Sequence, residues 1–272
     1  MPTQAEKGAT FRALHRRDHA FNIPNPWDVG TGKLLQLLGF EALATTSGGF
    51  AFSLGKPDGA VDRETMLTHA AALAAATDVP VSADLENGYR DDPSGVAETV
   101  RLATEVGLAG CSIEDAPAGR ERKPYELSLA AERVRAAAEA AHSVAFPFTL
   151  TARAENYLVG RPDLRDTIAR LHAFQEAGAD VLYAPGLKSK QDIVAVVRSV
   201  DRPVNVIMGL QGVQLSLAEL SEMGVKRVSV GSALSRAAMG AFLRAAREMR
   251  EHGTFTFAED AANYAELNSM FS

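Results

Sequence analysis

The sequence of 272 residues lacks several features that mark particular classes of protein. Cys111 is its single cysteine, which excludes an intramolecular disulfide and a cluster of cysteine metal ligands. No apolar run is long enough to cross a bilayer, and residues 1–20 lack the apolar segment of a signal peptide. We therefore expect a cytoplasmic protein with no membrane partner.

Clustered positive charge is also missing. The chain carries 28 Lys and Arg against 34 Asp and Glu, a net charge of −6, and acids interrupt its two basic stretches, "RALHRRDH" and "GRERKP". A nucleic-acid site needs a continuous basic surface, so we expect no nucleic-acid partner. The hydrophobic fraction of 46% and charged fraction of 23% are typical of a globular protein.

The sequence does contain a regular alternation of short β-rich runs and Ala-rich amphipathic segments. The runs have little internal alternation, which is typical of parallel strands covered on both faces. The expected strands are 21–23, 42–46, 80–85, 110–113, 148–152, 181–184, 204–208 and 227–230.

Eight such units in this length predict an α/β fold of the (β/α)8 TIM-barrel type. A doubly wound sheet is the alternative, but "NPWDVGTGK" after the first run has no G-x-G-x-x-G turn. No Pro/Gly/Ser-rich linker interrupts the series, so we expect a single barrel domain over residues 1–272. It includes an extra N-terminal helix at about 5–18 and a C-terminal tail, "AEDAANYAELNSMF".

Polar residues gather where the predicted strands end. The second, third, fourth and fifth runs end in "TTSGG", "ADLENGY", "IEDA" and "TARAE", and the seventh contains Asn205. The opposite ends carry turn residues. Because active sites of such barrels lie at the C-terminal ends of the strands, we expect the site there.

Three acids are the main candidates for chemistry. Asp84 and Glu86 are two residues apart, which predicts that they share one strand face, and Glu114 is expected at the same height on the next strand. Converging carboxylates repel one another unless a cation neutralises them, and oxygen ligands suit Mg²⁺, with Mn²⁺ possible. Alternatively, the acids cap helices or pair with Lys and Arg.

Two further features could hold an anion. The glycines of Ser47-Gly48-Gly49 would let backbone N–H groups approach a carboxylate or a developing oxyanion, although an ordinary loop is the alternative. Arg153 in a barrel mouth needs an anionic partner, and bidentate carboxylate binding is its natural use. Its alternative partner is Glu155, on the same face.

Taken in order, these motifs resemble the isocitrate lyase/phosphoenolpyruvate mutase superfamily. "NPWD", "TTSGG", "SLGKPDG", "ADLENGY", "GCSIEDA", "TARAE", "NVIMG" and "RVSVGSALSRAA" carry the resemblance from about residue 10 to 250. It implies a barrel whose eighth helix is swapped between subunits, in a homodimer or homotetramer. It also implies Mg²⁺-dependent chemistry on a small 2-oxo carboxylate through an enolate.

The resemblance further implies a role for each matching position. The catalytic candidates are Asp58, Arg153 and Ser47; the substrate-binding candidates are Ser47, Gly48, Gly49, Arg153, Asn205 and Arg236; the metal candidates are Asp84, Glu86 and Glu114.

The sequence also departs from the family pattern. Isocitrate and methylisocitrate lyases carry a K-[KR]-C-G-H loop after the fourth strand, whereas "EDAPAGRERKPYEL" here has neither cysteine nor histidine. The longer gating loop of the mutase branch is shortened around Lys123, and "NGYR" places Arg90 near the mouth. The chain therefore looks most like the branch that includes oxo-acid lyases and oxaloacetate decarboxylases.

We thus predict a Mg²⁺-dependent lyase that cleaves a C–C bond of a small 2-oxo or 2-hydroxy carboxylate through a metal-stabilised enolate. One alternative is a C–P bond enzyme resembling phosphonopyruvate hydrolase or phosphoenolpyruvate mutase. The other is a protein that binds a 2-oxo acid without turning it over. Loop shapes set specificity in these barrels, so the exact substrate is not predicted.

Overall fold

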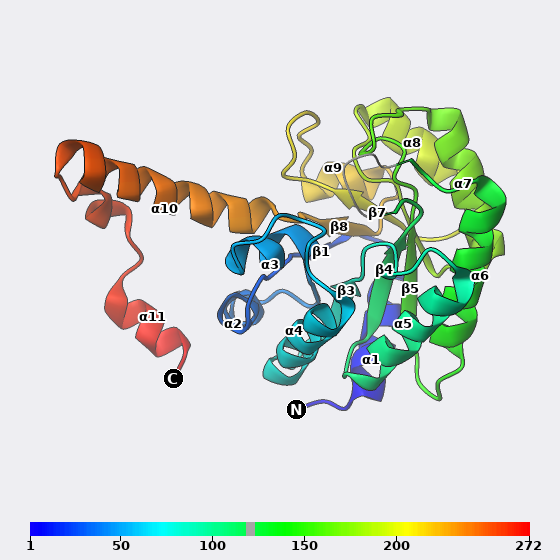
Figure 1. Cartoon of the computed structure of the whole chain (residues 1–272), viewed down its shortest axis with the longest axis horizontal. Helices are drawn as coiled ribbons and strands as arrows, with labels where there is room; N and C mark the ends of the chain where they lie inside the picture. Colours follow the sequence, from blue (N-terminus) through cyan, green and yellow to red (C-terminus); the bar gives the residue numbers. More distant parts are fainter. Residues whose placement is uncertain (118–122) are drawn as a thin grey trace.

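Eight parallel strands form a nearly closed barrel ringed by helices in the computed structural model, which describes residues 1–117 and 123–272 (Figure 1). The strands are β1 (Phe21–Ile23), β2 (Leu43–Ala44), β3 (Val81–Asp84), β4 (Gly110–Glu114), β5 (Thr149–Arg153), β6 (Val181–Tyr183), β7 (Val204–Ile207) and β8 (Arg227–Ser229). Their order around the sheet is β1-β8-β7-β6-β5-β4-β3-β2. The predicted barrel is confirmed, and every strand end lies within two residues of its expected position.

The barrel closes just beyond the short strands β1 and β2. The backbone N–H of Ala44 donates to the carbonyl oxygen of Pro24 at 3.1 Å, and the side-chain amide of Asn25 donates to the carbonyl oxygen of Thr45 at 2.9 Å. Residues in the turn after β1 therefore join β1 to β2, as backbone ladder hydrogen bonds join the other neighbouring strands.

Helices alternate with the strands, and most of them bury one face against the barrel. They are α1 (Gln4–Leu14), α2 (Val29–Leu37), α3 (Ser47–Ser53), α4 (Arg63–Ala76), α5 (Pro93–Glu105), α6 (Leu127–His142), α7 (Leu164–Glu176), α8 (Lys190–Ser199), α9 (Leu217–Glu222), α10 (Ala233–His252), the 3-10 turn η1 (Thr256–Asp260) and α11 (Tyr264–Met270). Side-chain caps such as Asp62 for α4 and Asp92 for α5 accept hydrogen bonds from first-turn N–H groups.

Helix α1 closes the floor of the barrel, the end at which the strands begin. A capping box between Thr3 and Glu6 starts the helix, which ends earlier than the predicted residue 18. Phe11 and Leu14 are fully buried and pack with the β1 residues Phe21 and Ile23 in one apolar cluster. The floor is therefore plugged by side chains from outside the repeating units.

Helix α10 leaves the barrel as a long arm, and η1 and α11 hang from its far end (Figure 1). Ser235 is the one buried residue of this helix, while Phe242 is 69% exposed and Leu243 is 47% exposed. The eighth helix thus does not cover its own barrel. No helix in the described ranges is both long and apolar enough to cross a membrane.

Candidate active site

A cavity of about 180 Å³ lies inside the barrel and opens at the C-terminal ends of the strands. Its charged and amide side chains are Asp58, Asp84, Arg153, Asn205, Asn25 and Arg227. Hydroxyl-bearing residues complete the polar lining: Thr45, Thr46, Ser47, Ser82, Ser112, Tyr183, Ser229 and Ser232. The location of the site was predicted from the strand ends.

Asp84 is the carboxylate that β3 brings to this cavity. Its Oδ1 lies 3.1 Å from Nη1 of Arg153, and its Oδ2 accepts a hydrogen bond of 3.3 Å from the backbone N–H of Ser47. The N–H of Asp84 itself donates to Oγ1 of Thr45 at 2.8 Å. The side chain is consequently fixed between β5 on one side and the start of α3 on the other.

Arg153 binds three carboxylates at once. Its Nη1 contacts Asp84 at 3.1 Å, its Nη2 contacts Glu114 at 3.0 Å and its Nε contacts Glu155 at 2.9 Å. Burial opposes the charged guanidinium, but the three carboxylates outweigh burial and hold the pKa of Arg153 well above its ordinary value. The predicted pairing with Glu155 is present, as one of three such pairs.

The three predicted metal acids do not share one face. Strand β3 ends at Asp84, and Glu86 has a left-handed backbone with φ of 48°, so the two-residue alternation no longer applies to it. The register pairs Asp84 with Ser112, while the N–H of Glu114 donates to the carbonyl oxygen of Glu86 at 2.8 Å. Glu114 is therefore level with Glu86 rather than with Asp84. Glu86 and Glu114 are buried and do not line the cavity.

The fit of a divalent cation depends on this arrangement. Within residues 1–117 and 123–272, no group of three His, Cys, Asp or Glu side chains is placed to hold a metal ion directly. Mg²⁺, however, keeps several waters and takes one or two protein carboxylates. A carboxylate offers about four lone-pair sites, and Asp84 uses three of them, for Arg153, Ser47 and the backbone N–H of Glu86. The donor chemistry at Asp84 therefore suits a hydrated Mg²⁺ ion.

The turn after β3 is held in an unusual backbone conformation. Glu86 and Tyr89 both have positive φ, 48° and 59°, which costs non-glycine residues about 1–3 kcal/mol each. The buried guanidinium of Arg133 donates to the carbonyl oxygens of Arg90 and Asp91 at 2.6 Å, and also to that of Asn87. This arginine clamps the strained turn from the outside of the barrel.

Ser47-Gly48-Gly49 is the first turn of α3 rather than a loop, with Thr46 as its N-cap. Ser47 and Gly48 line the cavity, but Gly49 does not, and its N–H donates to Oγ1 of Thr46 at 3.2 Å. A Cβ on Gly48 would lie 3.3 Å from Cγ of Asp58. The glycine thus lets Asp58 approach the helix terminus closely.

The remaining predicted residues separate into those at the cavity and those away from it. Asn205 lines the cavity, whereas Arg236 lies exposed on α10 and does not. Arg90 and Lys123 are also exposed and outside the lining. Residues 118–122, the middle of the shortened loop, lie outside the described residues.

The sequence did not reveal a row of polar residues that are paired across neighbouring strands from β4 to β8. Glu114 pairs with Arg153, Arg153 with Tyr183, Tyr183 with Asn205, and Asn205 with Arg227. Glu114 is the last residue of β4, whereas Arg227 is the first of β8, because strands in a barrel are staggered. The row therefore descends from the mouth toward the floor. The one indication of this row in the sequence was the charged Arg227 at the start of the apolar run "RVSV".

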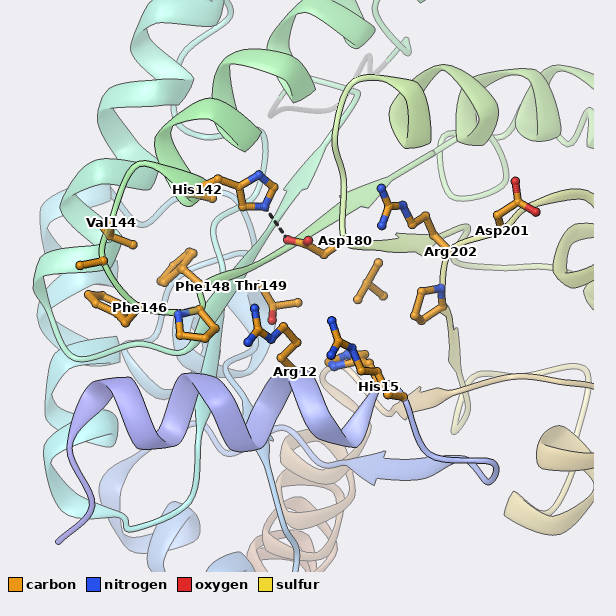
Figure 2. Close-up of a pocket in the computed structure, with 16 residues that line it drawn as sticks. Arg12, His15, His142, Val144, Phe146, Phe148, Thr149, Asp180, Asp201 and Arg202 are labelled. Atoms are coloured by element: carbon orange, nitrogen blue, oxygen red, sulfur yellow. Dashed lines mark hydrogen bonds and ion pairs between the residues drawn. The ribbon is translucent and has the colours of Figure 1, made fainter.

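A second and larger cavity, about 710 Å³, lies at the floor of the barrel beside α1 (Figure 2). Arg12 and His15 reach it from α1, and Arg202 reaches it from the turn before β7. A hydrogen bond of 3.0 Å joins Nε2 of His142 to Oδ2 of Asp180, the dashed line in Figure 2. This floor cleft shares no lining residue with the barrel cavity.

Comparison with known proteins places this geometry in a family. Residues 11–250 match the model of the phosphoenolpyruvate phosphomutase family. A crystal structure of a protein from Burkholderia cenocepacia J2315, assigned as a lyase/mutase, is 61% identical, covers 99% of this chain and 96% of its own, and superposes with a TM-score of 0.96.

Two curated relatives extend the comparison. An uncharacterized protein of Mycobacterium tuberculosis H37Rv is 34% identical over 89% of both chains. The oxaloacetate decarboxylase of Pseudomonas aeruginosa is 30% identical over 90% of this chain and 86% of its own. The chain belongs to the phosphoenolpyruvate phosphomutase family, within the isocitrate lyase/phosphoenolpyruvate mutase superfamily.

Proposed function

We propose that the protein is a Mg²⁺-dependent lyase that cleaves a C–C bond of a small 2-oxo or 2-hydroxy carboxylate through an enolate. The observation that carries the proposal is Asp84, an ionisable carboxylate fixed at the cavity between the Arg153 guanidinium and the Ser47 N–H. Mg²⁺ bound there would supply a Lewis acid that stabilises negative charge on the 2-oxo oxygen.

The chain's own residues would bind the substrate and handle its proton. Arg153 keeps Asp84 oriented, because breaking their 3.1 Å contact would leave both groups poorly solvated. Ser47 and Gly48 form the wall against which the 2-oxo acid would lie. Asp58 lines the cavity yet is exposed, so it is placed to pass a proton between the substrate and bulk water.

The α10 arm supports a second proposal, that the working form is a homodimer or homotetramer with a swapped eighth helix. Phe242 and Leu243 on α10 and Phe255 beyond it are exposed large apolar side chains on a segment that does not pack on its own barrel. Such a surface is typical of a site that a partner covers. Size-exclusion chromatography with light scattering tests this proposal directly.

A turnover screen tests the catalytic proposal. The purified protein is incubated with oxaloacetate, methylisocitrate, phosphonopyruvate and malate-type acids, with Mg²⁺ or with a chelator. We expect carbonyl products from a C–C substrate only with Mg²⁺. Phosphate release from phosphonopyruvate would instead favour the C–P alternative, and tight binding without turnover would favour a binding protein.

Asp84→Asn sharpens the same screen. The substitution keeps the shape but removes the charge, and we expect turnover to fall by about 10²–10³, the usual cost of removing one electrostatic stabiliser. Asp180→Asn at the floor is the matched control and should leave turnover unchanged. Turnover that survives both the chelator and Asp84→Asn would contradict the metal-dependent mechanism.

A further inference from the structure

Arg227 is the one charged residue of the barrel cavity that the proposed chemistry does not use. It is the first residue of β8, is 5% exposed and lines the cavity. Its Nε donates to Oδ1 of Asn205 at 2.8 Å. Its Nη1 is buried and has no hydrogen-bond partner among the described residues. Buried guanidinium donors are normally all engaged, so this one calls for a ligand.

The two cavity arginines differ in their counter-charges. Arg153 contacts three carboxylates, whereas no carboxylate in the described part of the chain pairs with Arg227. Burial, reinforced by the charge of Arg153, lowers the pKa of Arg227 to about 10, and Tyr183 offsets only part of this. Arg227 is therefore still cationic at neutral pH, and its charge is uncompensated.

Neutral side chains hold Arg227 in place. Asn205 accepts from Arg227 through Oδ1 and donates through Nδ2 to Oγ of Ser229 at 3.0 Å, which fixes the orientation of the amide. Ser229 also lines the cavity. The Nε side of the guanidinium is thus anchored, and Nη1 remains for a ligand.

We propose that Arg227, oriented by Asn205, binds a second carboxylate of the substrate at the inner end of the cavity. This inference rests on the proposed function and narrows its substrate class to dicarboxylates. The stagger of the strands sets Arg227 toward the floor, while Asp84 ends its strand at the mouth. A dicarboxylate would span the distance from Arg227 to Asp84, with its reacting 2-oxo end at Asp84. Arg236 on α10 lies outside this cavity.

Calorimetric titration tests the subsite with a matched pair of four-carbon acids. The dicarboxylate is 3,3-difluorooxaloacetate and the monocarboxylate is 2-oxobutyrate, each titrated with Mg²⁺ present. We expect the wild-type protein to bind the diacid about 30-fold more tightly, the usual range for a charge-assisted contact. Arg227→Met should remove that preference and leave the binding of 2-oxobutyrate within about twofold.

Arg227→Lys keeps the charge but not the planar fork, so it should retain part of the preference. It also serves if Arg227→Met fails to fold, which thermal melting reveals. Equal losses for both acids in the variants would mean that Arg227 is only structural. A wild-type protein without preference for the diacid would overturn the proposal.

A second measurement needs no substrate. Crystals of the wild-type protein soaked in bromide should give an anomalous peak beside Nη1 of Arg227, and crystals of Arg227→Met should not. A water at that position in place of bromide would overturn the anion site. If neither acid binds the wild-type protein, the proposed function fails, and the bromide peak alone decides whether Arg227 holds an anion.

Discussion

The two ends of the barrel carry similar numbers of charged side chains and use them differently. At the floor, Arg12 and Arg202 are exposed around a cleft of about 710 Å³, and Asp180 forms an ion pair with the partly exposed His142. At the mouth, Asp84 and Arg153 belong to a buried network beside a cavity of about 180 Å³. The larger cavity is therefore the less organised one, so volume alone is a poor guide to the active site.

The difference follows from solvation. Charges at the floor stay in water, where attraction is weak and no partner is required. Charges at the mouth are taken out of water, so each needs a counter-charge or a ligand, and their geometry becomes fixed. Arg153 pairs with three carboxylates, whereas Arg227 pairs with none among the described residues.

The sharpest contrast is expected from the same substitution at the two ends. Arg153→Met leaves the carboxylates of Asp84, Glu114 and Glu155 buried without their shared cation, which should lower the free energy of unfolding by about 3–5 kcal/mol. Arg12→Met at the floor should change it by less than about 0.5 kcal/mol. Urea unfolding measures both, and comparable losses would contradict the contrast.

A smaller effect is expected from His15, a buried residue in the lining of the floor cleft. Burial, together with the charge of Arg227, lowers the pKa of His15 to about 3, against about 6.5 in the unfolded chain. Between these pH values His15 is protonated in the unfolded state but not in the folded state. The free energy of unfolding therefore falls as the pH drops from 6.5 toward 3. At pH 5 this amounts to about 2 kcal/mol.

His15→Gln should accordingly reduce the loss in free energy of unfolding between pH 7 and pH 5, measured by urea unfolding. His19→Gln, at an exposed position just beyond α1, is the control and should leave the pH dependence of the free energy of unfolding unchanged. An unchanged pH profile in His15→Gln would mean that the ring is protonated in the folded protein.

The smallest effect is expected in the floor cleft. A hydrogen bond to Asp180 raises the pKa of His142, so this pair stabilises the fold below about pH 6.5 and loses its contribution as the pH rises further. Because His142 is 46% exposed, His142→Ala should cost no more than about 0.5 kcal/mol at pH 6. At pH 8 the variant should match the wild type, and a loss of turnover at either pH would overturn the passive role given to this end.

The strand positions and the mouth residues were predictable because apolar runs have visible ends. Asp84 and Arg153 each terminate such a run, and both line the cavity. The arrangement of Glu86 was not predictable, since its left-handed backbone depends on the clamp that Arg133 provides from a distant helix.

Arg227 escaped sequence analysis for a geometric reason. Residues at the start of a strand are expected at the floor, outside the site. The stagger between strands brings the first residue of β8 into one row with the last residue of β5, through Tyr183 and Asn205. A linear sequence carries no record of that stagger, which exists only once the barrel closes.

The plug formed by Phe11 and Leu14 has a consequence for the order of events in a catalytic cycle. A barrel sealed at one end has a single entrance, so in the proposed lyase the substrate would enter and both products would leave by the same route. The fragment nearer the mouth would then depart before the fragment that the proposed subsite at Arg227 would hold. Product release is therefore expected to be ordered, and the inner product should inhibit in competition with the substrate.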